Sequence, residues 1–324
     1  MTNTTVSTLS ANAAPTRFDI RVVSAFFAIY VFWGATFLAI RVVVQEVPPL
    51  FAAGIRFFVA GVLLYGFMRL KGRPRPATAQ WRNLALIGLL MFVAEYGALF
   101  WAEKYVPSGV TSVLEATLPL ITIVLEMFVF RQQPLHWGLL FATLLGFGGV
   151  GVLLLPNGEQ HFGLLPCVAI FAGATAWSMG SVLNRSLELP ESKPLAAGAM
   201  MMLGGGVLLL LSAAFGELHP FPHVSMRAAL ALLYLIVCGS LLGFTAFVWL
   251  LARMPATRVA SHAYVNPIVA VALGYFVAGE IITTRMLLGA ALVLISVFLI
   301  LRKDKVPRMG SMPPRCAEDE AAIS

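Results

Sequence analysis

The chain has 324 residues, of which 59% are hydrophobic and 11% are charged. Soluble domains carry about 25% charged residues, so this chain cannot cover itself with a polar surface, and the composition predicts a polytopic membrane protein. The net charge of +7 does not indicate nucleic-acid binding, because the Lys and Arg residues crowd short loops and the C-terminal tail. The three cysteines form no CxxC pair or Cys/His cluster, so we expect no disulfide framework, no metal site and no cofactor.

Ten apolar runs follow one another along the chain, each close to the roughly 20 residues that a helix needs to cross a bilayer. They lack the alternation over about 10 residues that marks the strands of a membrane barrel. The first run follows a polar start and precedes nine more, so we interpret it as a retained span and not as a cleaved signal. The predicted fold class is an all-α integral membrane protein with ten transmembrane helices, at about residues 21–41, 49–69, 82–103, 107–130, 135–155, 163–185, 194–215, 228–251, 257–278 and 284–301.

Lys and Arg residues are distributed unevenly between the two sides of these spans. With a cytoplasmic N-terminus, the cytoplasmic side holds most of them, including the basic loop RLKGRPRP at 69–76. Cytoplasmic loops carry such an excess in membrane proteins generally. We therefore predict that both termini are cytoplasmic and that the protein lies in the plasma (inner) membrane, with only four basic residues in the outer connections: Arg41, Lys104, Arg227 and Arg285.

The sequence also repeats itself. WGATFLAIR at 33–41 matches WSMGSVLNR at 177–185 in its Trp and Arg, 144 residues later, and FWAEKYVPSGVTSVLEATLPLI at 100–121 aligns with VWLLARMPATRVASHAYVNPIV at 248–269. Each half holds five spans, and an odd number places the second half the other way up in the membrane, as in many secondary transporters. The predicted organisation is two inverted five-helix repeats between two cytoplasmic tails, with the segments 1–19, 20–156, 157–302 and 303–324.

Four stretches of the chain, WGATF, PPLFAAGIRFF, FWAEKYVPSGV and NPIVAVALGYFVAGE, resemble the EamA group of the drug/metabolite transporter superfamily. The resemblance covers roughly residues 22–302. It implies ten helices in two inverted repeats with cytoplasmic termini, and movement of small organic metabolites, often export of amino acids or toxic compounds. It also implies that the first four helices of each half surround a central cavity, which the fifth helices, about 135–155 and 284–301, support.

The two halves differ at the end of their fourth span, which commonly ends in Gly-Glu in this family. The second half keeps this pair, ending at Glu280, whereas the first half has Arg131–Gln132, a change that the positive-inside bias explains. We expect Glu280 to make a helix-end contact just before a threonine, Thr283 or its neighbour, caps the last helix.

Three charged residues lie well inside predicted spans: Arg56, Glu95 and Glu115. At about 1.5 Å per residue, each lies about 10–12 Å from the outer end of its span, so the three share one layer. Charges at such depth usually face the interior of a bundle or a water-filled cavity. If Arg56 neutralises one glutamate, the other holds a proton or meets a cationic group of the substrate. These residues are therefore candidates for substrate binding or coupling, and the alternative is a buried structural network.

Three further charged residues lie closer to the membrane surfaces. Glu126 is about one turn from the inner end of its span, and we expect it to reach toward Arg131. Glu103 and Lys104 are expected at the outer membrane edge in the same way.

Pro119 and Pro267 correspond to each other in the two halves and lie near the middle of their spans. A proline frees a backbone carbonyl one turn earlier and tends to kink a helix. We predict helix kinks with a gating role at both positions, although such kinks also occur in purely structural spans.

Aromatic and polar residues of both halves complete the predicted binding layer. Trp33 and Trp177 correspond to each other and lie mid-span, away from the interfaces where Trp usually sits, so they either line the site or pack. Tyr264 and Asn266 lie opposite the acids, where Asn266 can bond a polar substrate or the kinked backbone. We interpret His262 as a structural or interfacial residue.

Two motif matches do not carry the chemistry that they suggest. GFGGVG at 146–151 fits the dinucleotide pattern but lies in an apolar run without a preceding strand, so it predicts close helix packing. HPFPH at 219–223 spaces two histidines by four, but its prolines break the helix that would align them.

These observations predict a secondary transporter that works as an exporter of small organic metabolites, such as amino acids or amine-bearing and cationic compounds, by alternating access. The expected partners are the solute, protons and the lipid bilayer, and the protein is expected to be a monomer or a homodimer and not an enzyme. Two alternatives come from other classes: a membrane-embedded lipid-modifying enzyme, which needs a nucleophile or metal cluster that we do not find, and a non-transporting membrane sensor.

Overall fold

The computed structural model describes residues 20–131, 137–154, 163–217, 224–251, 259 and 261–303. The predicted tails at 1–19 and beyond 303, the boundary between 156 and 157, and the HPFPH segment lie outside the described residues. Within the described ranges the regular structure is helical, as expected for apolar chain in lipid, where each backbone polar group needs an internal partner.

The described helices form ten rods, one for each predicted span, and four of the rods change their helical type along the way. Eight rods are long and apolar enough to cross a membrane, and the last two contain shorter apolar stretches, His262–Ala278 and Thr284–Leu299. The rods are α1–η1–α2 (Ile20–Phe27, Ala28–Phe32, Trp33–Val44), α3 (Pro49–Leu70), α4–η2–α5 (Thr78–Gly88, Leu89–Ala94, Glu95–Ala102), α6–α7–η3 (Ser108–Glu115, Leu118–Val124, Leu125–Val129), α8 (Trp137–Leu154), α9 (Leu164–Ser186), α10 (Lys193–Ala214), α11–η4–α12 (Met226–Tyr234, Leu235–Leu242, Gly243–Leu251), α14 (His262–Ala278) and α15 (Thr284–Lys303).

Local sequence explains where several rods begin and end. Pro49 occupies the first turn of α3, where its missing N–H needs no partner. Gly279 ends α14 in a left-handed conformation with φ 67°, which glycine adopts without strain. Thr283 caps α15, because its hydroxyl oxygen accepts a hydrogen bond from the N–H of Met286 at 3.2 Å, which confirms the predicted threonine cap.

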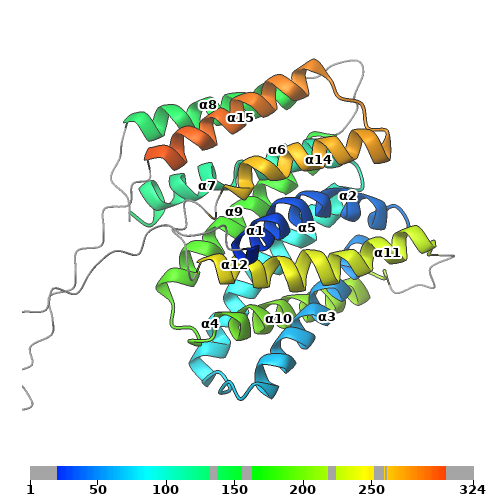
Figure 1. Ribbon diagram of the computed structural model, residues 1–324, viewed down its shortest axis with the longest axis vertical. Coiled ribbons are helices and arrows are strands. Elements are labelled where there is room, and N and C mark those ends of the chain that lie inside the picture. Colours follow the sequence, from blue (N-terminus) through cyan, green and yellow to red (C-terminus); the bar gives the residue numbers. More distant parts are fainter. Residues whose placement is uncertain are drawn as a thin grey trace, which may run out of the picture.

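A seam of glycines joins α3 to α10, the second rods of the two halves, at one edge of the bundle (Figure 1). A Cβ atom on Gly61 would lie 2.2 Å from the main-chain nitrogen of Met202, and one on Gly205 would lie 2.2 Å from that of Phe58. Gly205 and Met202 correspond in the repeat to Gly61 and Phe58. In each helix, the corresponding glycine therefore contacts the corresponding position of the other helix.

A second glycine seam lies at the opposite edge, where α8 and α15 run side by side (Figure 1). A Cβ atom on Gly149 would lie 2.9 Å from the carbonyl oxygen of Gly289, and one on Gly146 would lie 2.7 Å from the Ser296 hydroxyl. Gly146 and Gly149 belong to GFGGVG, so the predicted close helix packing is confirmed.

Four rods contain a π-helical segment, and two of these segments correspond to each other. Residues 89–94 of η2 align with 237–242, which lie within η4 at Leu235–Leu242. π-Segments are rare and often mark functional sites, because the extra residue displaces the backbone from its regular hydrogen bonds. The sequence carries no signal that predicted them.

The two corresponding prolines differ in their effect on the chain. The fourth rod is interrupted at Ala116 and Thr117, two residues before Pro119, and the kink with a gating role stays a prediction at both prolines. Pro267 lies within α14, which continues from His262 to Ala278 without interruption. The same residue therefore divides one helix and is accommodated by the other.

Candidate functional site

Arg56 of α3 is a fully enclosed cation, with 1% of its surface exposed. Its Nε donates to the hydroxyl oxygen of Ser240 at 3.1 Å, and its guanidinium carbon lies 4.6 Å from the ring centroid of Phe57 and 5.1 Å from that of Tyr96. Cation–π contacts of this kind are stronger where water is excluded. Its Nη1 has no hydrogen-bond partner in the described chain, so one guanidinium nitrogen remains available to an anionic group.

Glu95 and Glu115 form a buried carboxyl pair. They are 3% and 8% exposed, and each carboxyl group is close enough to interact with the other. An ionised carboxylate only accepts hydrogen bonds, so a bond between two carboxyl groups requires one shared proton. Oε2 of Glu95 and Oε1 of Glu115 have no partner among the described residues, so the pair keeps free acceptors.

The predicted pairing of Arg56 with one of these acids is wrong. No ion pair joins Arg56 to Glu95 or Glu115 in the part of the chain that the structure describes. The guanidinium instead packs on aromatic rings, and Tyr96 stands beside both groups: it follows Glu95 in the chain and its ring contacts Arg56. The depth estimate brought the acids together, but it could not give the direction of each side chain around its helix.

Gly173 of α9 is a contact of the acid pair that the sequence did not indicate. A Cβ atom at this position would lie 2.8 Å from Oε2 of Glu95 and 3.2 Å from its Cα. The absence of a side chain on Gly173 therefore allows α9 to approach Glu95 closely.

Trp33 and Trp177 belong to one aromatic cluster, which joins the two halves through Phe244. Their ring centroids lie 5.5 Å and 6.4 Å from that of Phe244, and Trp177 lies 6.0 Å from Tyr96. The indole N–H of Trp33 donates to the carbonyl oxygen of Gly239 in η4 at 3.0 Å. The cluster thus connects the arginine, the acid pair and a π-helical segment. Phe244 escaped prediction because an apolar ring in an apolar span gives no signal.

Asn266 bonds the backbone of the first rod. With its amide oriented to suit the surrounding donors and acceptors, the amide nitrogen donates to the carbonyl oxygens of Ile29 and Tyr30, both at 3.1 Å. These carbonyls belong to η1 in the first rod, whereas the predicted backbone partner was the kinked chain beside Pro267. His262 packs edge-on against Trp33 with centroids 5.0 Å apart, in agreement with a structural role.

Tyr264 does not join the acid pair. Its ring packs against Phe298 of α15 at 6.3 Å between centroids, and its hydroxyl group is buried without a partner in the described chain. Among the residues predicted for the binding layer, it is the one that contacts the fifth rod of its own half.

Three carboxylates connect the two halves at one end of the bundle, which we call the acidic end. It carries the connections 45–48, 103–107 and 279–283 and the described residues 215–217 and 224–225. Glu280 accepts hydrogen bonds from the N–H of Ser108 at 2.9 Å, its hydroxyl at 2.8 Å and the N–H of Gly109 at 3.1 Å. It therefore caps α6 of the other half, whereas we expected it to make a helix-end contact near α15. A carboxylate in this position also suits the positive N-terminal end of the helix dipole.

The other two carboxylates of the acidic end have the same role. Glu46 accepts from the N–H and the hydroxyl of Ser225, both at 2.7 Å, and Glu217 accepts from the N–H of Phe51 at 3.0 Å. The hydrogen bonds from Ser225 hold the pKa of Glu46 below its usual value. Each contact joins a loop acid of one half to a helix start in the other.

Glu103 is not the surface residue that the sequence predicted. It is 0% exposed, whereas its neighbour Lys104 is exposed as expected. Neither oxygen of the Glu103 carboxyl group has a hydrogen-bond partner in the described chain. The guanidinium of Arg41 donates to the main-chain carbonyl of Glu103 and not to its carboxyl group.

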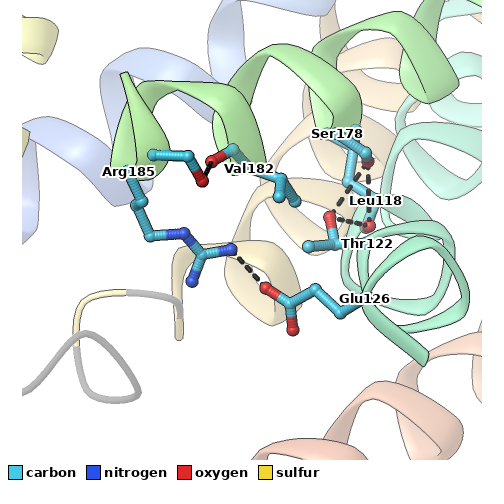
Figure 2. A network of polar contacts seen from close by, with 7 residues as sticks. Leu118, Thr122, Glu126, Ser178, Val182 and Arg185 are labelled. Atoms are coloured by element: carbon cyan, nitrogen blue, oxygen red, sulfur yellow. Dashed lines mark hydrogen bonds and ion pairs between the residues drawn. The ribbon is translucent and has the colours of Figure 1, made fainter. Parts of the chain in front are cut away.

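The opposite end, which we call the basic end, carries the connections 71–77 and 187–192 and the described residues 130–131. Figure 2 shows the guanidinium of Arg185 in an ion pair with Glu126, beside a hydrogen bond between Thr122 and Ser178 of 3.0 Å. The predicted partner of Glu126 was Arg131, and this prediction is wrong because Arg185 of the other half takes that place.

A helical bundle of apolar rods with unpaired charges enclosed at its centre is the architecture of a membrane transporter, because buried ionisable groups in a bundle line substrate and ion pathways. The sequence profile of the EamA-like transporter family matches residues 20–155 and 164–302, once in each half of the chain. The chain belongs to this family and is a multi-pass membrane transporter.

Relatives and a solved structure agree with this assignment. The chain is 34% identical to the "Uncharacterized inner membrane transporter YedA" of Escherichia coli K12 over 85% of its own length and 89% of that protein. It is 27% identical to the "Probable amino-acid metabolite efflux pump" of the same organism, over 87% of this chain and 96% of the relative. A crystal structure with 18% identity shares the fold with a TM-score of 0.62, covering 86% of this chain and 95% of the other.

Proposed function

We propose that the protein is a secondary transporter that exports amine-bearing metabolites, such as amino acids, across the inner membrane by alternating access. The observation that carries the proposal is the Glu95–Glu115 pair, which is enclosed in a transporter-family bundle and retains two unpaired carboxyl oxygens. Unpaired acceptors in a buried site suit a group that arrives with its own donors, and a protonated amine brings three. The name of the efflux-pump relative supports the direction and the substrate class.

We further propose that the two halves, 20–156 and 157–302, are inverted repeats and that all ten rods cross the membrane. Two observations support this. The reciprocal contacts of Gly61 and Gly205 relate α3 to α10 by an approximate two-fold axis, and the corresponding segments η2 and η4 share their π-helical conformation. Two similar halves of opposite orientation can exchange inward-open and outward-open arrangements around one central site.

The residues of the layer divide the work of binding. We assign the substrate amine and the exchangeable proton to Glu95 and Glu115, and the substrate carboxylate to the free Nη1 of Arg56. Trp33 and Trp177 supply the aromatic wall between these charges. A zwitterionic substrate would therefore place its amine at the two glutamates and its carboxylate at Arg56, with aromatic rings between the two positions.

The remaining predicted residues support the site without contacting substrate. Asn266 holds η1 in place. The interruption of the fourth rod before Pro119 is assigned as the point at which that rod moves, and Pro267 is assigned a gating role within the continuous helix α14. Tyr264 contacts α15 and is assigned to the support that the fifth rods provide.

The orientation follows from the positive-inside rule, which places the basic end and both termini in the cytoplasm. The acidic end is then outside, and its three carboxylate contacts close it in this conformation. Export requires these contacts to break after the substrate has entered from the basic end.

The test is transport in proteoliposomes that contain the purified protein. Amino acids and amines are presented at the basic end with and without a pH gradient, and Glu115→Gln is compared with the wild type. Loss of transport in Glu115→Gln is expected, while Glu191→Gln, at an exposed glutamate of a basic-end loop, retains it. If no amine or amino acid crosses the membrane, or if Glu115→Gln transports like the wild type, the assignment fails.

A further inference from the structure

Glu103, the first residue of the acidic-end connection 103–107, carries another buried carboxyl group. Glu103 follows α5 directly and stands eight residues beyond Glu95, which is about 12 Å along the helix axis. It is completely enclosed, and neither of its carboxyl oxygens has a partner in the described chain. No role proposed above uses it.

Four charged groups act on Glu103, and they come from α2, α3, α6 and the connection after α14. Arg41 of α2 bonds its main-chain carbonyl, Arg56 of α3 is more distant, Glu115 of α6 lies on the inward side, and Glu280 follows α14. Glu280 is already engaged, because it accepts three hydrogen bonds from the start of α6. Two of these four groups are acids and two are arginines, so their charges oppose one another and the hydrogen bonding of Glu103 decides its charge.

An ionised carboxylate without a hydrogen bond is among the least favourable groups that a protein interior can hold. It is normally stabilised by an ion pair, by several donors or by a proton. The geometry supplies neither of the first two for Glu103, because the guanidinium of Arg41 is directed to the backbone. Protonation is the third way to stabilise the group, and a neutral carboxyl group is compatible with this enclosure.

We propose that Glu103 is a proton-binding site, loaded while the acidic end is closed, which exchanges protons between the outer medium and the Glu95–Glu115 pair. When the contacts of the acidic end break, water reaches Glu103 and it releases or takes up a proton. Inward transfer breaks the O–H bond on Glu103, leaves a carboxylate there and forms an O–H bond on Glu115. The transfer part of the proposal rests on the transport function proposed above, whereas the bound proton does not.

The bound proton is tested directly by infrared spectroscopy of the purified, reconstituted protein at neutral pH. A protonated carboxyl group has a C=O stretch that is separate from the bands of a carboxylate. Glu103→Gln is expected to remove one protonated-carboxyl band from the wild-type spectrum. Glu46→Gln is the control and removes none, because the Ser225 hydrogen bonds hold the pKa of Glu46 below its usual value. An unchanged band in Glu103→Gln overturns the proposal.

Stability provides a second measurement if Glu103→Gln folds poorly. Glu103→Met replaces the carboxyl group with an apolar side chain of similar size. If Glu103 is protonated and unpaired, the unfolding temperature of Glu103→Met equals or exceeds that of the wild type. If Glu103 is an ionised partner of Arg41, Glu103→Met loses stability and the double variant with Arg41→Met regains it, and the proposal is wrong.

Transport separates this proposal from the function on which it rests. With a substrate that the wild type moves, Glu103→Gln is expected to lower accumulation driven by a pH gradient about a hundredfold, the lower end of what a positioned proton-transfer group contributes. Substrate exchange without a gradient stays within twofold of the wild type. Equal losses in both assays, or accumulation driven by a sodium gradient, contradict a proton relay. A wild type that transports nothing refutes the proposed function and leaves the infrared result standing.

Discussion

The acidic and basic ends of the bundle are joined by different chemistry. At the acidic end, three carboxylates each bond the start of a helix in the other half, and Glu280 alone accepts three hydrogen bonds. At the basic end, the ion pair found among the described residues joins Glu126 to Arg185, whose side chain is 62% exposed. Loop acids on helix starts position two backbones, whereas an exposed ion pair is screened and adds little.

This difference indicates which end of the bundle is more firmly held in this conformation. Glu280 corresponds to Gln132 in the repeat, at the end where basic residues are needed for orientation. The first half therefore has no glutamate at the position that corresponds to the capping carboxylate of the second half. We infer that the acidic end is the more firmly held of the two in this conformation.

The largest expected effect on stability comes from the glycine seam between α3 and α10, which runs along the bundle between its two ends. In Gly61→Ala, the new Cβ atom meets the backbone of Met202 at 2.2 Å, which no side-chain rotation can relieve. We expect a loss of about 1–3 kcal/mol or more, as for other overpacked interiors. The measurement is thermal unfolding in detergent together with the yield of folded protein.

Gly66→Ala is the matched control for the seam. Gly66 lies on the same helix, and nothing stands within 4 Å of its missing Cβ atom. This variant is expected to be as stable as the wild type or slightly more stable, because alanine favours a helix interior over glycine. If both variants behave alike, the seam does not hold the halves together.

The second effect concerns the closed end itself. Glu280→Ala removes three hydrogen bonds to a charged acceptor, each of which contributes about 1.5–3 kcal/mol in other proteins. We expect the open form to gain at least about tenfold in population, since 1.4 kcal/mol corresponds to one factor of ten. The reporter is Ser112→Cys, 1% exposed beneath this contact, in a protein without its natural cysteines.

Labelling of this cysteine by a water-soluble thiol reagent from the acidic end should accelerate in Glu280→Ala. Glu280→Gln keeps one acceptor oxygen and is expected to give an intermediate rate. Equal rates in all three proteins would show that Glu280 does not control access.

Much of this arrangement could be predicted from the sequence, because length and hydropathy determine it. Each of the ten predicted apolar runs contains one helical rod in the structure. The estimated depth along the helices correctly placed Glu95 and Glu115 near each other. Depth says nothing about direction around the helix. Arg56 therefore met aromatic rings in place of an acid, and Glu103, at the depth of a surface residue, faces the bundle interior.

The contacts between the two halves could also not be predicted from the sequence. Glu280 bonds a helix start 171 or 172 residues away, and Glu126 bonds Arg185 in place of the nearer Arg131. Both depend on how the halves are juxtaposed, which no local pattern contains. The π-helical segments have no compositional signature at all.

A third and smaller effect is the pH dependence of the Glu46 contact. Its pKa is lowered by the hydrogen bonds from Ser225, so the contact is fully stabilising above the usual carboxyl value of 4.5 and is lost as the pH falls through the lowered pKa. Glu46→Gln should therefore unfold at a lower temperature than the wild type at pH 7. The two curves should converge below pH 4.5, and a constant difference at all pH values would contradict this origin.

The smallest effect is expected at the basic end, and it decides whether the two ends really differ. Arg185→Gln removes an ion pair whose cation is mostly in water, and such pairs contribute about 0–1 kcal/mol. The reporter is Ser178→Cys, which lies beside Thr122 within the same network (Figure 2) and is labelled from the basic end. We expect its labelling rate to change less than fivefold, and to change less still at high salt, where exposed pairs are screened. A change as large as that of Glu280→Ala at the acidic end would mean that the ion pair closes the basic end as firmly. The asymmetry between Glu280 and its repeat partner would then have no consequence for access.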